Sequence, residues 1–538
     1  MNFAERIRAE LKRAALAAGA PDDVEPLLER PRDPALADWA SNIAMVLARP
    51  LRRKPAEIAA TIRDSIDRAA AGLDRIEIAG PGFLNFRLDQ VAVAESIREL
   101  VAQNHGFGRT NTGENCPVVV EFVSANPTGP LHVGHGRQAA LGDAISSLLE
   151  WTGWNVSREF YYNDAGVQID NLELSVRAHI HANGTDAKIP EGGYHGEYVR
   201  EIAMRFDASS GDDVREFAVR ALRAEQDLDM QAFGVKFDTY YLESSLYTDG
   251  KVQEAVDLLI ANGHTYESEG ALWLRTTDYG DDKDRVMRKR DGTYTYFVPD
   301  VAYHLTKWKR GFTRAINVQG ADHHGTTTRV RAGLRALNVG IPEGYPEYAL
   351  HQMVTVVKEG EEVKISKRAG SYVTVRDLID WVGRDAVRFF FLMRKADSPL
   401  VFDVDLARRQ SDENPVYYLQ MAHARMSGIF RVGEIDAAEM DISNVSLAVL
   451  SEPEEQALIK QLIDFPMEVA GAAAALEPHR LATYALETAR LAHLWYHKHH
   501  VLNEPDAIMN ARLALARAAQ IVIRNTLHLL GLSAPERM

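Results

Sequence analysis

Between residues 116 and 150 an apolar run, a turn rich in proline and glycine and a long apolar stripe follow one another directly. The β-branched run "CPVVVEFVS" suits a buried parallel strand. Residues 124–130 carry the turn, and apolar positions recur at helical spacing over 135–150. "NVSREFYY" (155–162) then predicts a second strand. This order predicts a βαβ unit whose ligand binds at the carboxyl end of the first strand.

Two histidines stand where this helix is expected to begin. His132 and His135 lie about one helical turn apart, and the N-terminal amides of a helix favour a phosphate. Gly134 leaves room for a nucleotide to approach the backbone. Neither the dinucleotide glycine fingerprint nor a P-loop is present, which excludes hydride transfer and ordinary P-loop hydrolysis. On spacing alone, a helix cap with two surface histidines remains an equal alternative.

A second stretch, "VKISKRAG", decides between these interpretations. It sets Lys364 and Lys367 around Ser366, and two lysines three residues apart can bind a triphosphate and stabilise leaving pyrophosphate. Alone, such a stretch is most often a charged surface loop. Together with the two histidines, it predicts a nucleotide site.

The chain of 538 residues is too long for one hydrophobic core, and its texture changes along its length. We expect an α/β protein with three domains: a small α+β domain at 1–112, a Rossmann-type domain at 113–385 and an all-α bundle at 386–538. Residues of roughly 165–290 are expected to be an insertion between the two halves of the Rossmann-type domain.

The composition bounds the function classes. With 46% hydrophobic and 25% charged residues and no long apolar run, the chain predicts a cytoplasmic protein with no membrane segment. A single cysteine, Cys116, excludes an internal disulfide framework and a multi-cysteine zinc site. The net charge of −15 argues against a wholly basic nucleic-acid binder but leaves room for a local basic face.

The motifs resemble those of one enzyme family. His132–His135 is similar to the HIGH signature of class I aminoacyl-tRNA synthetases, and Lys364–Lys367 to their KMSK signature, each with one apolar exchange. The stretches that resemble bacterial arginyl-tRNA synthetases are "VEFVSANPTGPLHVGHGR", "TYFVPDVAYH", "GADHHG", "ENPVYYLQMAHAR" and "SAPERM". The resemblance covers nearly the whole chain. It implies a class I catalytic core, a tRNA-contacting N-terminal domain and an anticodon-binding helical bundle.

The resemblance also implies a reaction. L-Arginine would be activated with ATP to arginyl-adenylate, with release of pyrophosphate. The arginyl group would then pass to the 2′-hydroxyl of the terminal adenosine of tRNA(Arg), with release of AMP. Mg²⁺ would be bound through the ATP phosphates, and no metal site in the protein is expected. We expect a monomer.

By the same resemblance, individual residues receive roles. The expected catalytic residues are His132, His135, Lys364 and Lys367. The expected ATP-binding residues are Pro130, Gly134, His135, Ser366 and Lys367. The expected arginine-binding residues are Glu121, Ser124, Asn126, His135, Tyr296, Asp300 and Asp322. The expected tRNA-binding residues are Tyr496 and Met538.

Several of these assignments have alternatives. Asp300 is the expected main partner of the guanidinium, with Tyr296 covering it and Asn126 holding the α-amino end, but Asp300 also suits a helix N-cap before "VAYHLTKW". Gln319 competes with Asp322 as an acceptor. For Tyr496, core packing is as plausible as contact with RNA bases.

Other functions fit these residues less well. A small-molecule nucleotidyltransferase shares the histidine turn but has no use for a long C-terminal helical region. A regulatory protein without catalysis should have lost one of the four signature histidines and lysines. A class I enzyme for cysteine or lysine should show a different pocket. Zinc binding by His323–His324, or by the "HLWYHKHH" tract, is disfavoured because neither brings a thiol or a carboxylate at ligand spacing.

Overall fold

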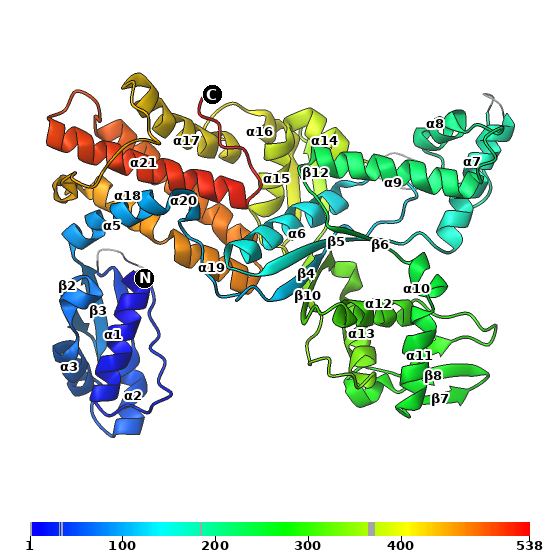
Figure 1. Cartoon of the computed structure of the whole chain (residues 1–538), viewed down its shortest axis with the longest axis horizontal. Helices are drawn as coiled ribbons and strands as arrows, with labels where there is room; N and C mark the ends of the chain where they lie inside the picture. The colour runs from blue at the N-terminus through cyan, green and yellow to red at the C-terminus, as the bar shows by residue number, and fades with distance from the viewer. Residues whose placement is uncertain (1–2, 32, 34–35, 183–185, 364–371) are drawn as a thin grey trace.

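The computed structural model describes residues 3–31, 33, 36–182, 186–363 and 372–538. These residues form helices α1–α21, strands β1–β14 and four short 3₁₀ helices. Figure 1 shows an elongated molecule in which the N-terminal unit lies below the helical bundle, and two excursions project from the far side of the central sheet. Within the described ranges, no helix is long and apolar enough to cross a lipid bilayer.

The N-terminal unit is a three-stranded antiparallel sheet, in the order β1-β3-β2, with helices packed against it. Exposure alternates residue by residue along β3, as expected for a strand with one covered face. Its elements are α1 (Phe3–Ala17), β1 (Trp39–Ser41), α2 (Ile43–Leu51), α3 (Pro55–Ser65), α4 (Arg68–Ala71), β2 (Leu73–Ala79) and β3 (Phe83–Leu88). The small α+β fold expected from the sequence is confirmed.

The centre of the molecule is a five-stranded sheet in the order β11-β10-β4-β5-β6, with every neighbouring pair parallel. The strands are β4 (Pro117–Glu121), β5 (Asn155–Tyr162), β6 (Thr239–Leu242), β10 (Arg314–Gly320) and β11 (Glu347–His351). β4 and β5 flank α6 (Val133–Trp151), so the predicted βαβ unit is confirmed. The chain winds in opposite directions from β4 and β10, and such a switch point opens a crevice at the carboxyl ends of the strands.

The predicted insertion at roughly 165–290 is not one piece. β6 falls inside it and pairs with β5 in the central sheet, so two excursions leave the sheet. The first holds α7 (Val167–Ala182), α8 (Glu197–Arg205) and α9 (Val214–Ala232), which share a small hydrophobic core of their own. The second holds α10 (Ser244–Thr248), α11 (Lys251–Ala261), β7 (Thr265–Ser268), β8 (Ala271–Leu274), η2 (Thr276–Tyr279), β9 (Arg285–Arg288) and α12 (Phe297–Lys309). The sequence did not predict β6 because this strand, Thr239–Leu242, is only four residues long and too short for a clear alternation of apolar residues.

The predicted domain boundary at residue 385 also needs correction. It falls inside α15, and β14 pairs in parallel with β12, so the strand-containing region extends further. This region contains η3 (Ala321–His323), α13 (His324–Ala336), β12 (Val354–Lys358), β13 (Glu361–Glu362), α14 (Val375–Val382), α15 (Arg384–Leu392), β14 (Leu400–Asp403) and α16 (Val404–Arg408). The all-helical region therefore starts at α17.

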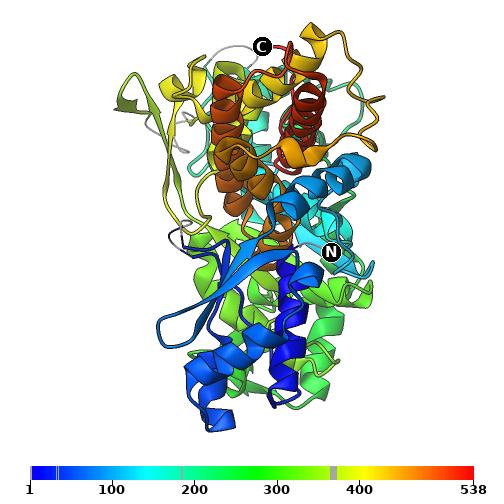
Figure 2. The ribbon, with the colours of Figure 1, turned by 90° about the vertical axis from the view of Figure 1, so that its left-hand side faces the viewer.

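The C-terminal bundle is held against the rest of the molecule by α5 (Gln90–Gln103), which is followed by η1 (Asn104–Gly106). Figure 2 shows α5 between the N-terminal unit and the bundle. Arg98 of α5 donates to the backbone carbonyls of Ile442, Ser443 and Val445. The bundle comprises α17 (Pro415–Val432), η4 (Leu447–Val449), α18 (Pro453–Ile463), α19 (Phe465–Ala475), α20 (Pro478–Lys498) and α21 (Asp506–Leu529).

Candidate active site

The two signature histidines form the cap of α6. His132 is the N-cap residue, and its Nδ1 accepts a hydrogen bond from the backbone N–H of Gly134 at 3.1 Å. The Nδ1 atom of His135 accepts from the backbone N–H of His132 at 3.3 Å, and the two rings stack with centroids 3.8 Å apart. Because Nδ1 accepts in both rings, the hydrogen of each neutral imidazole belongs on Nε2, which can donate to an anionic oxygen.

The cap and the phosphate-binding interpretations therefore coexist. The backbone amides and the dipole at the start of α6 favour an anion in the place where the two rings lie. Gly134 has a second reason to be glycine: a Cβ atom there would lie 2.9 Å from Cε1 and 3.0 Å from Nδ1 of His132. A side chain at this position would displace the His132 ring.

A cavity of about 550 Å³ opens in front of these histidines. It brings together five residues predicted from the sequence: Ser124, Asn126, Pro130, His132 and His135. The opposite wall comes from the α7–α9 excursion, with Gln168, Asn171, Tyr194 and Tyr198, and from Tyr372, five residues after the second signature. The turn and the excursion therefore enclose one site.

Glu121, at the end of β4, is buried beneath this site. Its carboxylate pairs with Lys307, whose side chain is fully buried, and accepts from Asn317 Nδ2 at 2.7 Å. Its other oxygen accepts from Ser124 Oγ at 2.8 Å. Both carboxylate oxygens thus already have protein partners, and Glu121 orients Ser124 from below.

Asp300, in the first turn of α12 (Phe297–Lys309), lies near the carboxylates of Glu121 and Glu243, and Glu243 was not among the residues predicted from the sequence. α12 begins at Phe297 with Tyr296 as its N-cap residue, so the alternative that Asp300 caps this helix is wrong. Burial, then the nearby carboxylates Glu243 and Glu121, raise the pKa of Asp300 to about 7. Burial and then Asp164 raise the pKa of Glu243 to about 7 as well.

Glu243 follows directly after β6, and its side chain is 5% exposed. Burial, then the carboxylates of Glu243 and Asp300, raise the pKa of the Tyr161 and Tyr247 hydroxyls, so both carboxylates lie near the same two tyrosines. Two desolvated carboxylates of raised pKa, one of which is disfavoured further by the charge of the other, make a site for a cation. A prediction of β6 would have placed Glu243 at the carboxyl edge of the sheet and so could have found it.

Three further predicted residues differ in exposure. Tyr296 is 78% exposed and does not bury Asp300 in this structure. The side chain of Asp322 is 81% exposed, with His323 Nε2 3.8 Å away. Gln319 stands two positions after Asn317 on β10, so both side chains lie on the same face of the sheet, toward Glu121.

The second signature, with Lys364, Ser366 and Lys367, lies outside the described residues. Its surroundings are described on both sides. Val363 donates from its backbone N–H to Val356 at 2.9 Å, and Val375 donates to the Leu131 carbonyl at 2.9 Å. Thr374 forms a β-bridge with His132. Thr374 and Val375, a few residues after the second signature, therefore lie beside Leu131 and His132 of the first.

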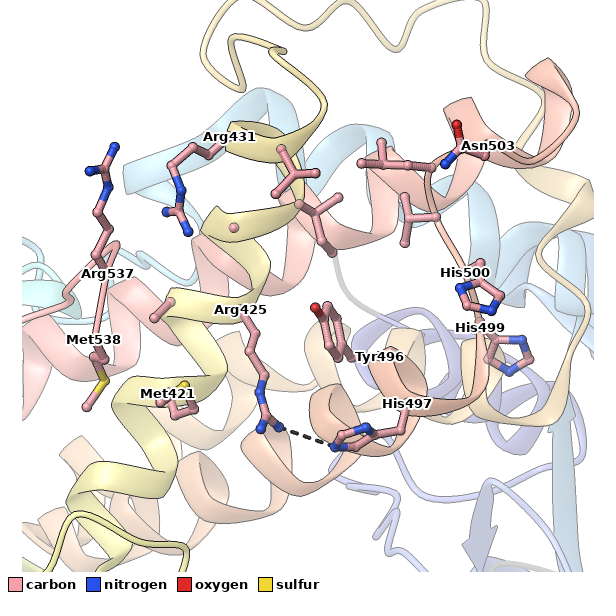
Figure 3. A pocket seen from close by; sticks show the side chains of 16 residues that line it. Met421, Arg425, Arg431, Tyr496, His497, His499, His500, Asn503, Arg537 and Met538 are labelled. Carbon is pink, nitrogen blue, oxygen red and sulfur yellow. Dashed lines mark hydrogen bonds between the residues drawn. The ribbon is translucent and has the colours of Figure 1, made fainter.

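The predicted RNA-contacting residues line a separate cavity of about 890 Å³ in the bundle (Figure 3). Tyr496 of α20 is 40% exposed and Met538 is 53% exposed, on two sides of this hollow. Arg425 lies 5.8 Å from the Tyr496 ring centroid and donates to His493 Nδ1 at 2.7 Å. Tyr496 is therefore not a fully buried core residue.

Comparison with known proteins agrees with this architecture. Three family descriptions match: "Arginyl tRNA synthetase N terminal domain" over residues 1–88, "tRNA synthetases class I (R), catalytic domain" over 96–397 and "DALR anticodon binding domain" over 419–538. Arginine–tRNA ligase of Cupriavidus necator is 54% identical, with 95% of each chain covered. That of Cupriavidus metallidurans is also 54% identical, covering 95% of this chain and 94% of its own.

The fold has a solved counterpart in Thermus thermophilus arginyl-tRNA synthetase. The TM-score is 0.78 at 24% identity, and the match covers 99% of this chain and all of the other. The sequence matches decide for arginine over the other class I amino acids and against a small-molecule nucleotidyltransferase. The chain belongs to the arginine–tRNA ligase family of class I aminoacyl-tRNA synthetases.

Proposed function

We propose specific roles for the residues of this site in the reaction of the family. The protein is an ATP-dependent arginine–tRNA ligase. It activates L-arginine with ATP to arginyl-adenylate, releasing pyrophosphate, and transfers the arginyl group to the 2′-hydroxyl of the terminal adenosine of its tRNA, releasing AMP. Positioning and charge stabilisation supply most of the rate in such phosphate chemistry.

We propose that the start of α6 binds the α-phosphate of ATP. The arginine carboxylate attacks this phosphorus, and negative charge grows on its oxygens as the bond to pyrophosphate breaks. The Nε2–H groups of His132 and His135 donate to these oxygens, and the backbone around Pro130 and Gly134 lies against the nucleotide. The capping bonds support this role because they fix the orientation of both rings. From the sequence, Lys364 and Lys367, with Ser366, hold the β- and γ-phosphates.

We propose that the guanidinium of arginine binds between Asp300 and Glu243. A guanidinium offers a planar fork of donors, and two carboxylates of raised pKa become ionised when a cation pairs with them. Asn126 and Ser124 face the other end of arginine, near His135. Gln319 is favoured over Asp322 as the further acceptor because it shares a sheet face with Asn317. Tyr296 would close over the pocket when arginine is bound, and Glu121 orients Ser124.

We assign Mg²⁺ to the ATP phosphates. Among the described residues, no group of three or more His, Cys, Asp or Glu side chains could hold a metal ion, and the assignment rests on the chemistry of ATP. When bound, Mg²⁺ would neutralise phosphate charge, and no role of the protein side chains depends on it.

We propose that tRNA(Arg) contacts the bundle at Tyr496 and Met538, where unstacked bases meet an aromatic ring and an apolar side chain. The arginines around this hollow, Arg425, Arg431 and Arg537, supply positive charge for the RNA backbone. We further propose that the enzyme acts as a monomer in the cytoplasm. The single cysteine, exposed on the surface, fits a reducing compartment.

One observation carries the assignment of the amino-acid pocket: burial, then the nearby carboxylates Glu243 and Glu121, which follow or end strands β6 and β4, raise the pKa of Asp300 to about 7. The test charges a total tRNA pool with each of the twenty amino acids in turn. We expect arginine alone to be transferred at an appreciable rate, and lysine to be rejected because a point charge cannot bridge two carboxylates as a guanidinium fork does. Preferred charging of any other amino acid would overturn the pocket assignment.

A further inference from the structure

The Pro/Gly turn (residues 124–130) that precedes the signature histidines has more backbone carbonyls than backbone N–H groups to pair with them. Pro127 and Pro130 have no backbone N–H, so the turn has few donors of its own. Its carbonyl oxygens still need partners where they are screened from water. In this structure four of these carbonyls, those of Asn126, Thr128, Gly129 and Pro130, accept from side chains that lie far away in the sequence.

Two of the donors come from the α7–α9 excursion. The amide of Gln226 in α9 is fully buried, and its Nε2 donates to Asn126 at 3.1 Å and to Gly129 at 2.8 Å. The hydroxyl of Tyr198 in α8 donates to Thr128 at 2.7 Å. The excursion, which has its own hydrophobic core, therefore holds the turn through two side chains.

The remaining donor comes from the far side of the second signature. Tyr372 is the first described residue after that segment, and its hydroxyl donates to the Pro130 carbonyl at 3.2 Å. Its ring also meets the His132 ring edge-on, with centroids 6.3 Å apart. Tyr372 thus touches both the turn and one of the histidines that the turn carries.

The two hydroxyls converge on one glycine. A Cβ atom at Gly129 would lie 2.9 Å from the Tyr372 hydroxyl and 3.1 Å from the Tyr198 hydroxyl. At such distances one or both rings must move. The turn therefore requires glycine here because two tyrosines occupy the space that a side chain would fill.

We propose that Tyr198, Gln226 and Tyr372 are positioning residues that fix the Pro/Gly turn, and with it the signature histidines, for the adenylation step. They touch no reacting atom and act through the backbone of the turn. The excursion thereby has a function in the chemistry, because it sets where His132 and His135 meet the phosphate. A small misplacement of such groups can reduce a rate by a large factor. This inference rests on the role proposed for the histidines.

The test removes single hydroxyl groups and compares matched pairs. Tyr198→Phe removes a 2.7 Å bond to a backbone carbonyl, and its control is Tyr484→Phe, which removes a 2.7 Å bond to the Gln461 carbonyl in the bundle. Tyr372→Phe removes a 3.2 Å bond, and its control is Tyr345→Phe, which removes a 3.2 Å bond to the Phe312 carbonyl. Gly129→Ala is a third variant that displaces both hydroxyls without changing either tyrosine.

The rate of arginyl-adenylate formation is measured at saturating ATP and arginine with tRNA present, together with the KM for arginine and the thermal midpoint. We expect Tyr198→Phe and Tyr372→Phe each to slow the reaction about 5- to 20-fold, and Gly129→Ala more, with the KM for arginine changed less than about threefold. The controls should stay within about twofold.

A merely structural role would lower the thermal midpoint of each variant and its control alike and leave the rate unchanged. Rates of the turn variants no lower than those of their controls would overturn the proposal. If His135→Ala keeps its normal rate while Tyr198→Phe slows the reaction, the role proposed for His135 is wrong. The turn would then still need its positioning residues, but to place a different catalytic group. The two failures are therefore distinguishable.

Discussion

The two halves of this site differ in how their polar groups are satisfied. At the Pro/Gly turn and the start of α6, the groups have partners: the histidine rings cap the helix, and side chains from three other segments hold the turn's carbonyls. In the proposed arginine pocket, the carboxylates of Asp300 and Glu243 are desolvated, and both pKa values rise to about 7. The first half is preorganised, whereas the second awaits a cation.

This difference follows from what each half must do. The phosphate site gains rate when its donors need no rearrangement as charge develops. The arginine pocket gains selectivity when its buried carboxylates are left in an unfavourable state by any uncharged ligand. In the proposed mechanism, one end of the crevice stabilises the transition state and the other end provides the selectivity for guanidinium.

The largest expected effect is at the preorganised half. His135→Ala removes one donor and one member of the reciprocal cap, and we expect adenylate formation to slow about 10²- to 10³-fold, the usual loss for one such contact. Pyrophosphate exchange with tRNA present measures the rate. His528→Ala, at an exposed position near the end of α21, is the control. A near-normal rate for His135→Ala would remove this residue from the mechanism.

The sequence was sufficient for the first half because its information is local. The strand, the turn and the helix that His132 caps follow one another within 35 residues, and each has its own pattern. The fold class and the C-terminal bundle could be predicted for the same reason. β6, and with it Glu243, could not be predicted, because a strand of four residues that pairs only with β5 is too short to give a periodic signal.

Asp300 was predicted only in part. The resemblance to a family motif identified it as a site residue, but the sequence did not show that α12 begins before it, at Phe297. Helix ends are set by capping contacts that single sequences specify weakly. The positioning residues of the turn could not be predicted from the sequence either, because Tyr198, Gln226 and Tyr372 come from three separate segments.

A smaller effect is expected at the pocket. Asp300→Asn keeps the shape of the side chain but removes its charge, so arginine binding should weaken by about 1.5–3 kcal/mol, the scale of a charged hydrogen bond. Glu243→Gln should behave alike, and ATP affinity should hardly change in either. Calorimetry measures both affinities. Asp464→Asn is the control, because burial raises the pKa of Asp464 to about 6 far from this pocket. Unchanged arginine affinity in Asp300→Asn would contradict the pocket.

The smallest expected effect is on stability, and its sign is unusual because the substitution should stabilise the protein. Because the pKa of Asp300 is raised on folding, the stability linked to this group is present below its unfolded pKa and lost as the pH rises through about 7. Asparagine stays neutral. Without arginine at pH 8, Asp300→Asn should therefore be more stable than the parent protein by about 1 kcal/mol. Near pH 4 the difference should vanish. Denaturant unfolding at the two pH values measures it, and a destabilised variant at pH 8 would show that the carboxylate is satisfied without ligand.

The most direct test of the contrast counts the protons released when arginine binds. If the guanidinium enters between two carboxylates of pKa about 7, binding ionises both and releases up to about one proton at pH 7 and almost none at pH 9. Titration calorimetry in buffers of different ionisation enthalpy gives this number. We predict a clear release at pH 7 that is reduced in Asp300→Asn and in Glu243→Gln. Arginine binding with no proton release at pH 7 would contradict the claim that this pocket awaits its cation in a partly protonated state.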